Sequence, residues 1–192
     1  LEIHKSVQYA DFALKKFFEA AQKESWYKNT IFVITADHTS QTKEKKYQTR
    51  SGAYQIPLLF FQPGDSTMQK QIGTYCSHVD IFPSIMHYIN YPEKFISFGQ
   101  SIFDSSTQNA VVTYVNTKYQ YLAHNQALYF DGKDFIAAYN LKTDILNKKN
   151  IIDQTNVISE IDKNKFKAIL QVFNERMTHN RLVISKSEVR QN

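Results

Sequence analysis

The sequence contains a single cysteine, Cys76, among its 192 residues. One cysteine cannot form a disulfide within the chain or supply a thiolate zinc site, so both kinds of cross-link are excluded. Glycine and proline are also scarce, at 5 and 4 residues, whereas there are 14 phenylalanines and 12 tyrosines. This composition is typical of packed helices and sheets and argues against a disordered or linker chain.

Long apolar runs are missing as well: no stretch approaches the roughly 18 residues that a membrane-spanning helix needs. The chain begins Leu1-Glu2-Ile3-His4, with neither an initiator methionine nor the pattern of a signal peptide. We therefore expect a soluble piece of a longer protein.

Positive charge is in modest excess, with a formal net charge of +5. Lysines and arginines alternate with acids along most of the chain, so we expect no nucleic-acid partner. The densest basic cluster is Lys43, Lys45 and Lys46, with Glu44 between them and Arg50 following. It lies in a polar loop, where a solvated surface and contact with an anion are both open interpretations.

The first half of the chain has the pattern of an α/β fold. Apolar residues from 7 to 23 recur every three or four positions, which predicts an amphipathic helix. The β-branched run at 30–36 predicts a strand covered on both faces, as in a mostly parallel sheet. A second strand is expected at 56–61, and a helix with Pro83 in its first turn is expected to follow Asp80 and end near 90–92.

After Gly99 the pattern changes to short β-rich runs with tight connections, typical of an antiparallel meander. The expected strands cover residues 110–115, 119–124, 127–130 and 135–139, and a final helix is expected over 159–179. These boundaries predict two domains, an α/β portion at 1–105 and an antiparallel-sheet subdomain with a C-terminal helix at 106–192.

Asp37 and His38 follow the strand predicted at 30–36. Ligands of open α/β sheets gather at the carboxyl ends of strands, and a carboxylate beside an imidazole suits Zn²⁺ or Mn²⁺. The spacing alone leaves two interpretations open, a metal-binding turn or a turn residue beside a surface imidazole.

Four motifs follow one another along the chain: Tyr27–Thr39 with its preceding helix, Ile56–Pro63, Ser77–Ser84 and Phe98–Ser101. Together and in this order they resemble lipoteichoic-acid-synthase-like proteins of the sulfatase family within the alkaline-phosphatase superfamily. The resemblance covers about residues 7–150. It implies part of an alkaline-phosphatase-like, mostly parallel sheet with helices, followed by a small antiparallel sheet and a C-terminal helix.

By this resemblance Asp37 and His38 are ligands of a catalytic divalent metal, Mn²⁺ or Zn²⁺, with Mg²⁺ or Ca²⁺ as alternatives. The family's nucleophile and a further acidic ligand lie upstream of the helix at 7–23, and nothing in this chain matches them. The implied enzyme transfers phosphoglycerol, or cleaves a phosphodiester or sulfate ester, through a covalent intermediate. We expect this chain by itself to be inactive.

The implied parent is anchored in the membrane by missing N-terminal helices, with its catalytic domain outside the cytoplasm. Its substrate is a lipid- or glycan-linked phosphate or sulfate ester, for which Arg50 is a candidate contact. A sheet that lacks strands exposes unpaired edges, so self-association is expected. The competing hypotheses are a pseudoenzyme and a non-catalytic module that binds a glycan or a protein.

Three other residues have simpler interpretations. Asp80 is expected to cap the helix that follows it, and His78 is expected to belong to the same helix entry, with a substrate contact as its alternative. Cys76 is expected to be a small buried apolar residue rather than a nucleophile, because no base is assigned beside it.

Overall fold

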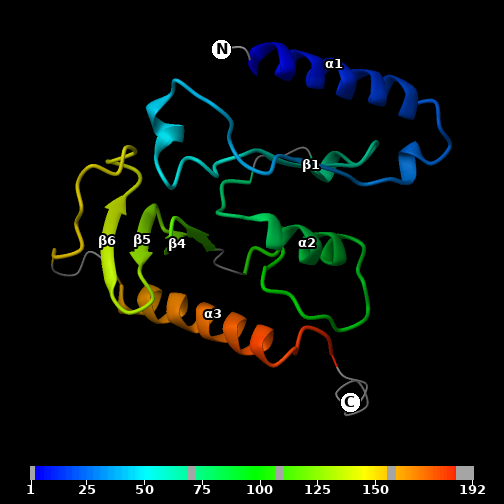
Figure 1. Cartoon of the computed structure of the whole chain (residues 1–192). Coiled ribbons are helices and arrows are strands. Elements are labelled where there is room, and N and C mark those ends of the chain that lie inside the picture. The colour runs from blue at the N-terminus through cyan, green and yellow to red at the C-terminus, as the bar shows by residue number, and fades with distance from the viewer. Residues whose placement is uncertain (1–2, 69–71, 107–109, 155–158, 185–192) are drawn as a thin grey trace. The chain divides into compact units, whose positions relative to one another are not determined.

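The structure is a computed structural model that describes residues 3–68, 72–106, 110–154 and 159–184 (Figure 1). The chain forms two compact units, Leu1–Gln71 and Ile72–Asn192, which are described in turn. This structural division falls at a different place from the family domain boundary expected at residue 105, which stays a prediction. Within the described residues, no helix is both long enough and apolar enough to cross a membrane.

The first unit consists of helix α1 (Ile3–Ala21), strands β1 (Phe32–Thr35) and β2 (Leu58–Phe61), and short 3₁₀ turns at Tyr27–Asn29, Lys45–Gln48 and Ser66–Met68. The predicted helix at 7–23 and the predicted strands at 30–36 and 56–61 are confirmed. Pro57, which has no N–H to donate, lies directly before β2 and leaves its ladder intact.

Strands β1 and β2 pair antiparallel, with Phe32 opposite Phe61 and Thr35 opposite Leu58. Every strand pair in the described part of the chain is antiparallel. The mostly parallel sheet therefore stays a prediction. An apolar run does not determine the direction of a strand's neighbour. Coverage of the strand on both faces is wrong for the described chain, because Phe32–Ile34 are only partly buried and Thr35 is exposed.

Aromatic side chains hold α1 against this two-stranded sheet. The ring centroid of Phe18 on α1 lies 5.1 Å from that of Phe32 and 6.1 Å from that of Phe61. Apolar residues nearer the start of the helix are exposed instead, Val7 at 58% and Leu14 at 41%. The apolar side of this amphipathic helix therefore packs against the sheet only in the last turns of α1.

The second unit begins with a 3₁₀ turn, η4 (His78–Asp80), and helix α2 (Ile81–Tyr88). Asp80 is 4% exposed and accepts the backbone N–H of Ser77 at 2.7 Å, which closes a capping box. Its other carboxylate oxygen accepts the N–H of Gln100 at 2.8 Å. Asp80 holds the N-cap position of α2, but the prediction that its side chain caps this helix is wrong. The carboxylate instead closes the preceding turn and ties a distant loop to the start of α2.

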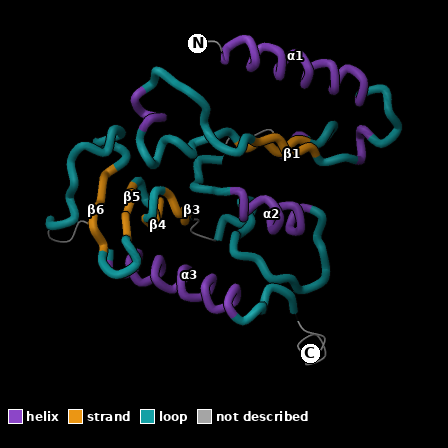
Figure 2. The backbone as a smooth tube through the Cα atoms, viewed as in Figure 1, coloured by secondary structure: helices purple, strands orange, loops and turns teal. Residues whose placement is uncertain are grey.

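Four strands follow in sequence order as an antiparallel meander: β3 (Val111–Val115), β4 (Lys118–Ala123), β5 (Gln126–Phe130) and β6 (Phe135–Asn140), drawn in orange in Figure 2. The predicted meander is confirmed. Two-residue turns join the first three strands, at Asn116-Thr117 and His124-Asn125, and all four turn residues have positive φ. Such turns match the twist of the flanking strands.

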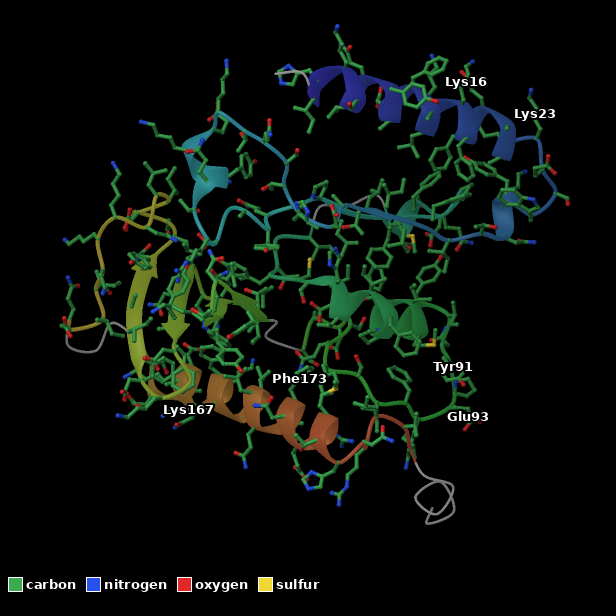
Figure 3. The ribbon with its side chains drawn as sticks, viewed as in Figure 1. Lys16, Lys23, Tyr91, Glu93, Lys167 and Phe173 are labelled. Atoms are coloured by element: carbon green, nitrogen blue, oxygen red, sulfur yellow. The ribbon has the colours of Figure 1, made fainter. Side chains whose placement is uncertain are left out.

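Helix α3 (Glu160–Thr178) confirms the predicted C-terminal helix and begins at Ser159, whose side chain accepts the N–H of Ile161. Phe166 on α3 is fully buried, and its ring centroid lies 5.2 Å from that of Tyr121 on β4. Lys167, labelled in Figure 3, places its Nζ 5.4 Å from the ring centroid of Phe135. The N-terminal half of α3 thus covers one face of the meander.

Candidate functional site

Asp37 and His38 lie in the turn that follows β1, as the sequence predicts. Both side chains are open to solvent, Asp37 at 86% and His38 at 60% exposed. The backbone N–H of His38 donates to Oδ1 of Asp37 at 2.9 Å, which holds the carboxylate against the turn.

One ring nitrogen of His38 contacts the backbone. Its Nδ1 lies 2.8 Å from the carbonyl oxygen of Thr39. A carbonyl oxygen only accepts, so Nδ1 is the donor in this contact, and Nε2 carries a lone pair when the imidazole is neutral. Metal-binding histidines commonly donate their other ring N–H to a backbone carbonyl in this way, which fixes the ring and raises its basicity.

The two donor atoms have the spacing of a chelate. Nε2 of His38 lies 3.5 Å from Oδ2 of Asp37. Two ligands about 2.1 Å from one tetrahedral metal lie about 3.4 Å apart. The pair therefore fits a divalent cation both in donor chemistry and in spacing. Among the described residues, no third His, Cys, Asp or Glu joins them to complete a site.

A loop leaves this turn and returns to it. The N–H and the hydroxyl of Thr39 both donate to the carbonyl of Ala53, at 3.0 and 2.7 Å. The loop between them contains the basic cluster, and Arg50, partly exposed, lies three residues before its closing point. The fold thus places the candidate contact Arg50 in the loop that adjoins the Asp37–His38 pair.

Gly52 is required by the way this loop closes. A Cβ at position 52 would overlap the backbone carbonyl of Lys46. Its N–H donates to the hydroxyl of Thr49 at 3.0 Å, and that hydroxyl donates to the same Lys46 carbonyl at 2.8 Å. The loop therefore has a specific folded shape.

Two other residues considered in the sequence analysis, Cys76 and His78, lie in the second unit, and Cys76 is only partly buried. Burial raises the pKa of the Cys76 thiol, and the nearby negative charge of Asp80 raises it further. A raised pKa leaves less thiolate at neutral pH, which supports the interpretation of Cys76 as a packing residue. His78 is exposed within η4, the turn that precedes α2.

One polar cluster of the second unit was not predicted from the sequence. Asp162, in the first turn of α3, is 8% exposed and accepts the hydroxyl of Tyr121 at 3.1 Å. The same carboxylate oxygen lies 3.4 Å from Nδ1 of His124, in the turn between β4 and β5. Burial raises the pKa of Tyr121, and the charge of Asp162 raises it further. An acid at a helix start is so common that nothing in the sequence marked this one.

Three comparisons with known proteins show what the chain is similar to. Residues 3–91 match the family model described as Sulfatase. The chain is similar to lipoteichoic acid synthase 1 of Bacillus subtilis (strain 168), at 23% identity over 120 residues, an alignment covering 55% of this chain and 18% of that protein. A solved structure, of a protein in the alkaline phosphatase superfamily from Vibrio parahaemolyticus, matches with a TM-score of 0.74 at 17% identity.

The structural match covers 93% of this chain, so the fold is the α/β fold of the alkaline-phosphatase superfamily. Its residues 3–91 are similar to the sulfatase family, and the chain is similar to a lipoteichoic acid synthase, as its four motifs suggested. It spans 42% of the structural neighbour and 18% of the curated relative.

Proposed function

We propose that this chain is the C-terminal part of the catalytic domain of a metal-dependent enzyme acting on phosphate or sulfate esters of cell-envelope lipids or glycans. The observation that carries the proposal is the chelate spacing of Asp37 and His38, inside the segment that matches the sulfatase family. Similarity to a lipoteichoic acid synthase favours phosphoglycerol transfer over hydrolysis of a phosphodiester or sulfate ester.

In this proposal Asp37 and His38 hold one Mn²⁺ or Zn²⁺ ion. The bond from Nδ1 of His38 to Thr39 keeps Nε2 directed as a ligand. A divalent metal bound here supplies Lewis acidity and neutralises negative charge on an ester. Arg50 contributes a planar, permanently charged guanidinium, which suits a phosphate or sulfate group.

The nucleophile and the remaining ligands belong, in this proposal, to a longer protein. The chain by itself is then inactive, because two ligands without a nucleophile leave no covalent step. We further propose that the longer protein is anchored in the membrane with this domain outside the cytoplasm. The similarity to a synthase of a lipid-linked envelope polymer supports this placement.

We propose that the longer protein also completes the sheet. In the described part of the chain β1 and β2 neighbour only each other, and the sequences Phe-Val-Ile-Thr and Leu-Leu-Phe-Phe carry no charge that would protect an edge. Several parallel strands, added at these edges, would give the mostly parallel sheet. Without it the chain self-associates, and sedimentation at rising protein concentration measures this.

The test of the metal site is calorimetric titration of the chain with Mn²⁺ and Zn²⁺. Asp37→Ala/His38→Ala removes both donors, and His4→Ala/Asp11→Ala removes the same two side-chain types from exposed positions of α1 as a matched control. We expect weak binding that the first variant abolishes and the control retains. Binding that survives the loss of Asp37 and His38 would contradict the proposal and favour a pseudoenzyme or a non-catalytic binding module.

A further inference from the structure

Three lysines lie in the loop that follows the candidate metal pair. Lys43 and Lys45 are exposed, and Nζ of Lys46 lies 5.3 Å from the ring centroid of Tyr47. None of the three forms an ion pair with a residue in the described part of the chain. By contrast, Lys16 and Lys163 pair with glutamates of their own helices at 2.7 and 2.6 Å.

The backbone that carries these lysines is folded rather than extended. Residues Lys45–Gln48 form a 3₁₀ turn. The side chain of Gln48 donates to the carbonyl of Thr42 at 2.9 Å, and the N–H of Glu44 donates to the hydroxyl of Thr42 at 3.0 Å. These bonds bracket the lysine cluster on both sides, so its charges are presented from one ordered segment.

The same loop is fastened next to the candidate metal ligands. Thr39, whose carbonyl accepts from His38, also bonds twice to Ala53 at the far end of the loop. The lysine loop and the Asp37–His38 turn therefore share one anchoring residue. The positively charged loop therefore begins directly after the two candidate ligands and closes back on the residue that follows them.

We propose that the loop of Lys43, Lys45 and Lys46 is a subsite for a second anionic group, a phosphate or sulfate other than the ester group held at the metal pair. The proposal rests on the proposed function for the position of the ester, and it narrows the substrate class to esters that carry at least one further negative charge. The carboxylate of Glu44 offsets one of the three lysine charges, so residues 43–46 carry a net charge of +2.

Lysine suits this task because its ammonium is a mobile point charge that follows an anion without fixed geometry. A single phosphate engages one or two such charges, whereas a chain of phosphates engages the whole cluster. The expected gain is therefore multivalent, with affinity rising with the number of linked anionic groups. Screening by salt weakens exposed contacts of this kind, so the effect is largest at low ionic strength.

The experiment titrates the full chain, without added metal, with inorganic phosphate and with tripolyphosphate at equal low ionic strength. We expect tripolyphosphate to bind at least about tenfold more tightly than phosphate. The variant Lys43→Gln/Lys45→Gln/Lys46→Gln should lose that advantage. Lys142→Gln/Lys148→Gln/Lys149→Gln is the matched control, since it removes three lysines around one acid, Asp144, from a loop of the second unit.

Equal losses in the two triple variants would overturn the proposal, since they would show a general surface charge effect. No difference between the two probes in the wild-type chain would also overturn it. Vesicles of phosphatidylglycerol, with phosphatidylcholine vesicles as reference, identify the source of the anion. Sedimentation of the wild-type chain, but not the Lys43 triple variant, with the anionic vesicles supports a lipid headgroup, and binding of tripolyphosphate alone supports a soluble one.

The Asp37→Ala/His38→Ala variant separates this proposal from the proposed function. In the absence of metal it should bind tripolyphosphate as tightly as the wild-type chain. If the variant still bound metal as the wild-type chain does, the metal centre would fail while the lysine subsite stood. If the variant lost metal binding but the Lys43 triple variant kept the advantage for tripolyphosphate, the subsite alone would fail.

Discussion

Replacing Gly99 by alanine tests how the two motifs Ser77–Ser84 and Phe98–Ser101 are joined. In the structure these segments meet at one point, where Asp80 accepts the N–H of Gln100 at 2.8 Å. Ser84, fully buried, donates its hydroxyl to the carbonyl of Asp80 and accepts the N–H of Ile102 at 3.0 Å. Gly99 lies between these bonds, directly against the start of α2.

A methyl group at position 99 has no room. It would overlap the backbone carbonyl of Val79 and would lie 2.6 Å from Oδ1 of Asp80. Overpacking against backbone costs about 1–3 kcal/mol. Moving the loop away weakens the bond from Gln100 to a buried carboxylate, and such a bond contributes about 1.5–3 kcal/mol. We expect Gly99→Ala to lower the free energy of unfolding by about 2–4 kcal/mol in total.

The assay combines urea denaturation with amide hydrogen exchange. A loss of about 3 kcal/mol shifts the urea midpoint down by roughly 1–2 M. The amides of Gln100 and Ile102, which Asp80 and Ser84 protect, should exchange faster in the variant.

Gly73→Ala is the matched control, because a Cβ at position 73 meets no atom within 4 Å. There the substitution only restricts the unfolded chain, so the free energy of unfolding should stay the same or rise by up to about 1 kcal/mol. An unchanged urea midpoint in Gly99→Ala, together with unchanged exchange at Gln100 and Ile102, would refute the reasoning.

Three further predictions concern the second unit. Phe166→Ala should lower the free energy of unfolding by about 3–5 kcal/mol in a urea titration, because its ring is fully buried, whereas Val172→Ala, at a 47% exposed position, should change it by less than about 0.5 kcal/mol. Burial and the charge of Asp162 raise the pKa of Tyr121 in the folded chain. Its contribution to stability is therefore present below the pKa of the unfolded chain and is lost as the pH rises above about 10. Tyr121→Phe should reduce the loss of stability in that alkaline range, and an equally steep loss would contradict the assignment. Hydrogen bonds from the N–H groups of Lys149 and Lys148 lower the pKa of Asp144 in the folded chain. The contribution of Asp144 to stability is therefore present above the pKa of the unfolded chain and is lost as the pH falls below about 4. Thermal unfolding of Asp144→Asn should depend less on pH in that acid range than unfolding of the wild-type chain.

The similarity to sulfatase-family proteins and most secondary structure could be predicted from the sequence. The spacing of apolar residues predicted α1 and α3, and alternation with turn residues predicted the meander of β3 to β6, because these patterns repeat over a few neighbouring residues. The position of Asp37 and His38 after a β-branched apolar run was also a local feature, and their close approach in the structure supports the metal interpretation, which the titration above tests.

The contacts between distant segments depended on the tertiary structure. The antiparallel pairing of β1 with β2, the bond from Gln100 to Asp80 and the bond from Tyr121 to Asp162 join residues that no short pattern relates; the last two span 20 and 41 positions. The hydrogen bond from Thr39 to Ala53, which closes the lysine loop, is another contact that no short pattern predicts. A sequence pattern records which side chains are apolar or charged, whereas the partner of a strand edge, a buried carboxylate or a loop end is chosen by packing and hydrogen bonding among segments brought together on folding.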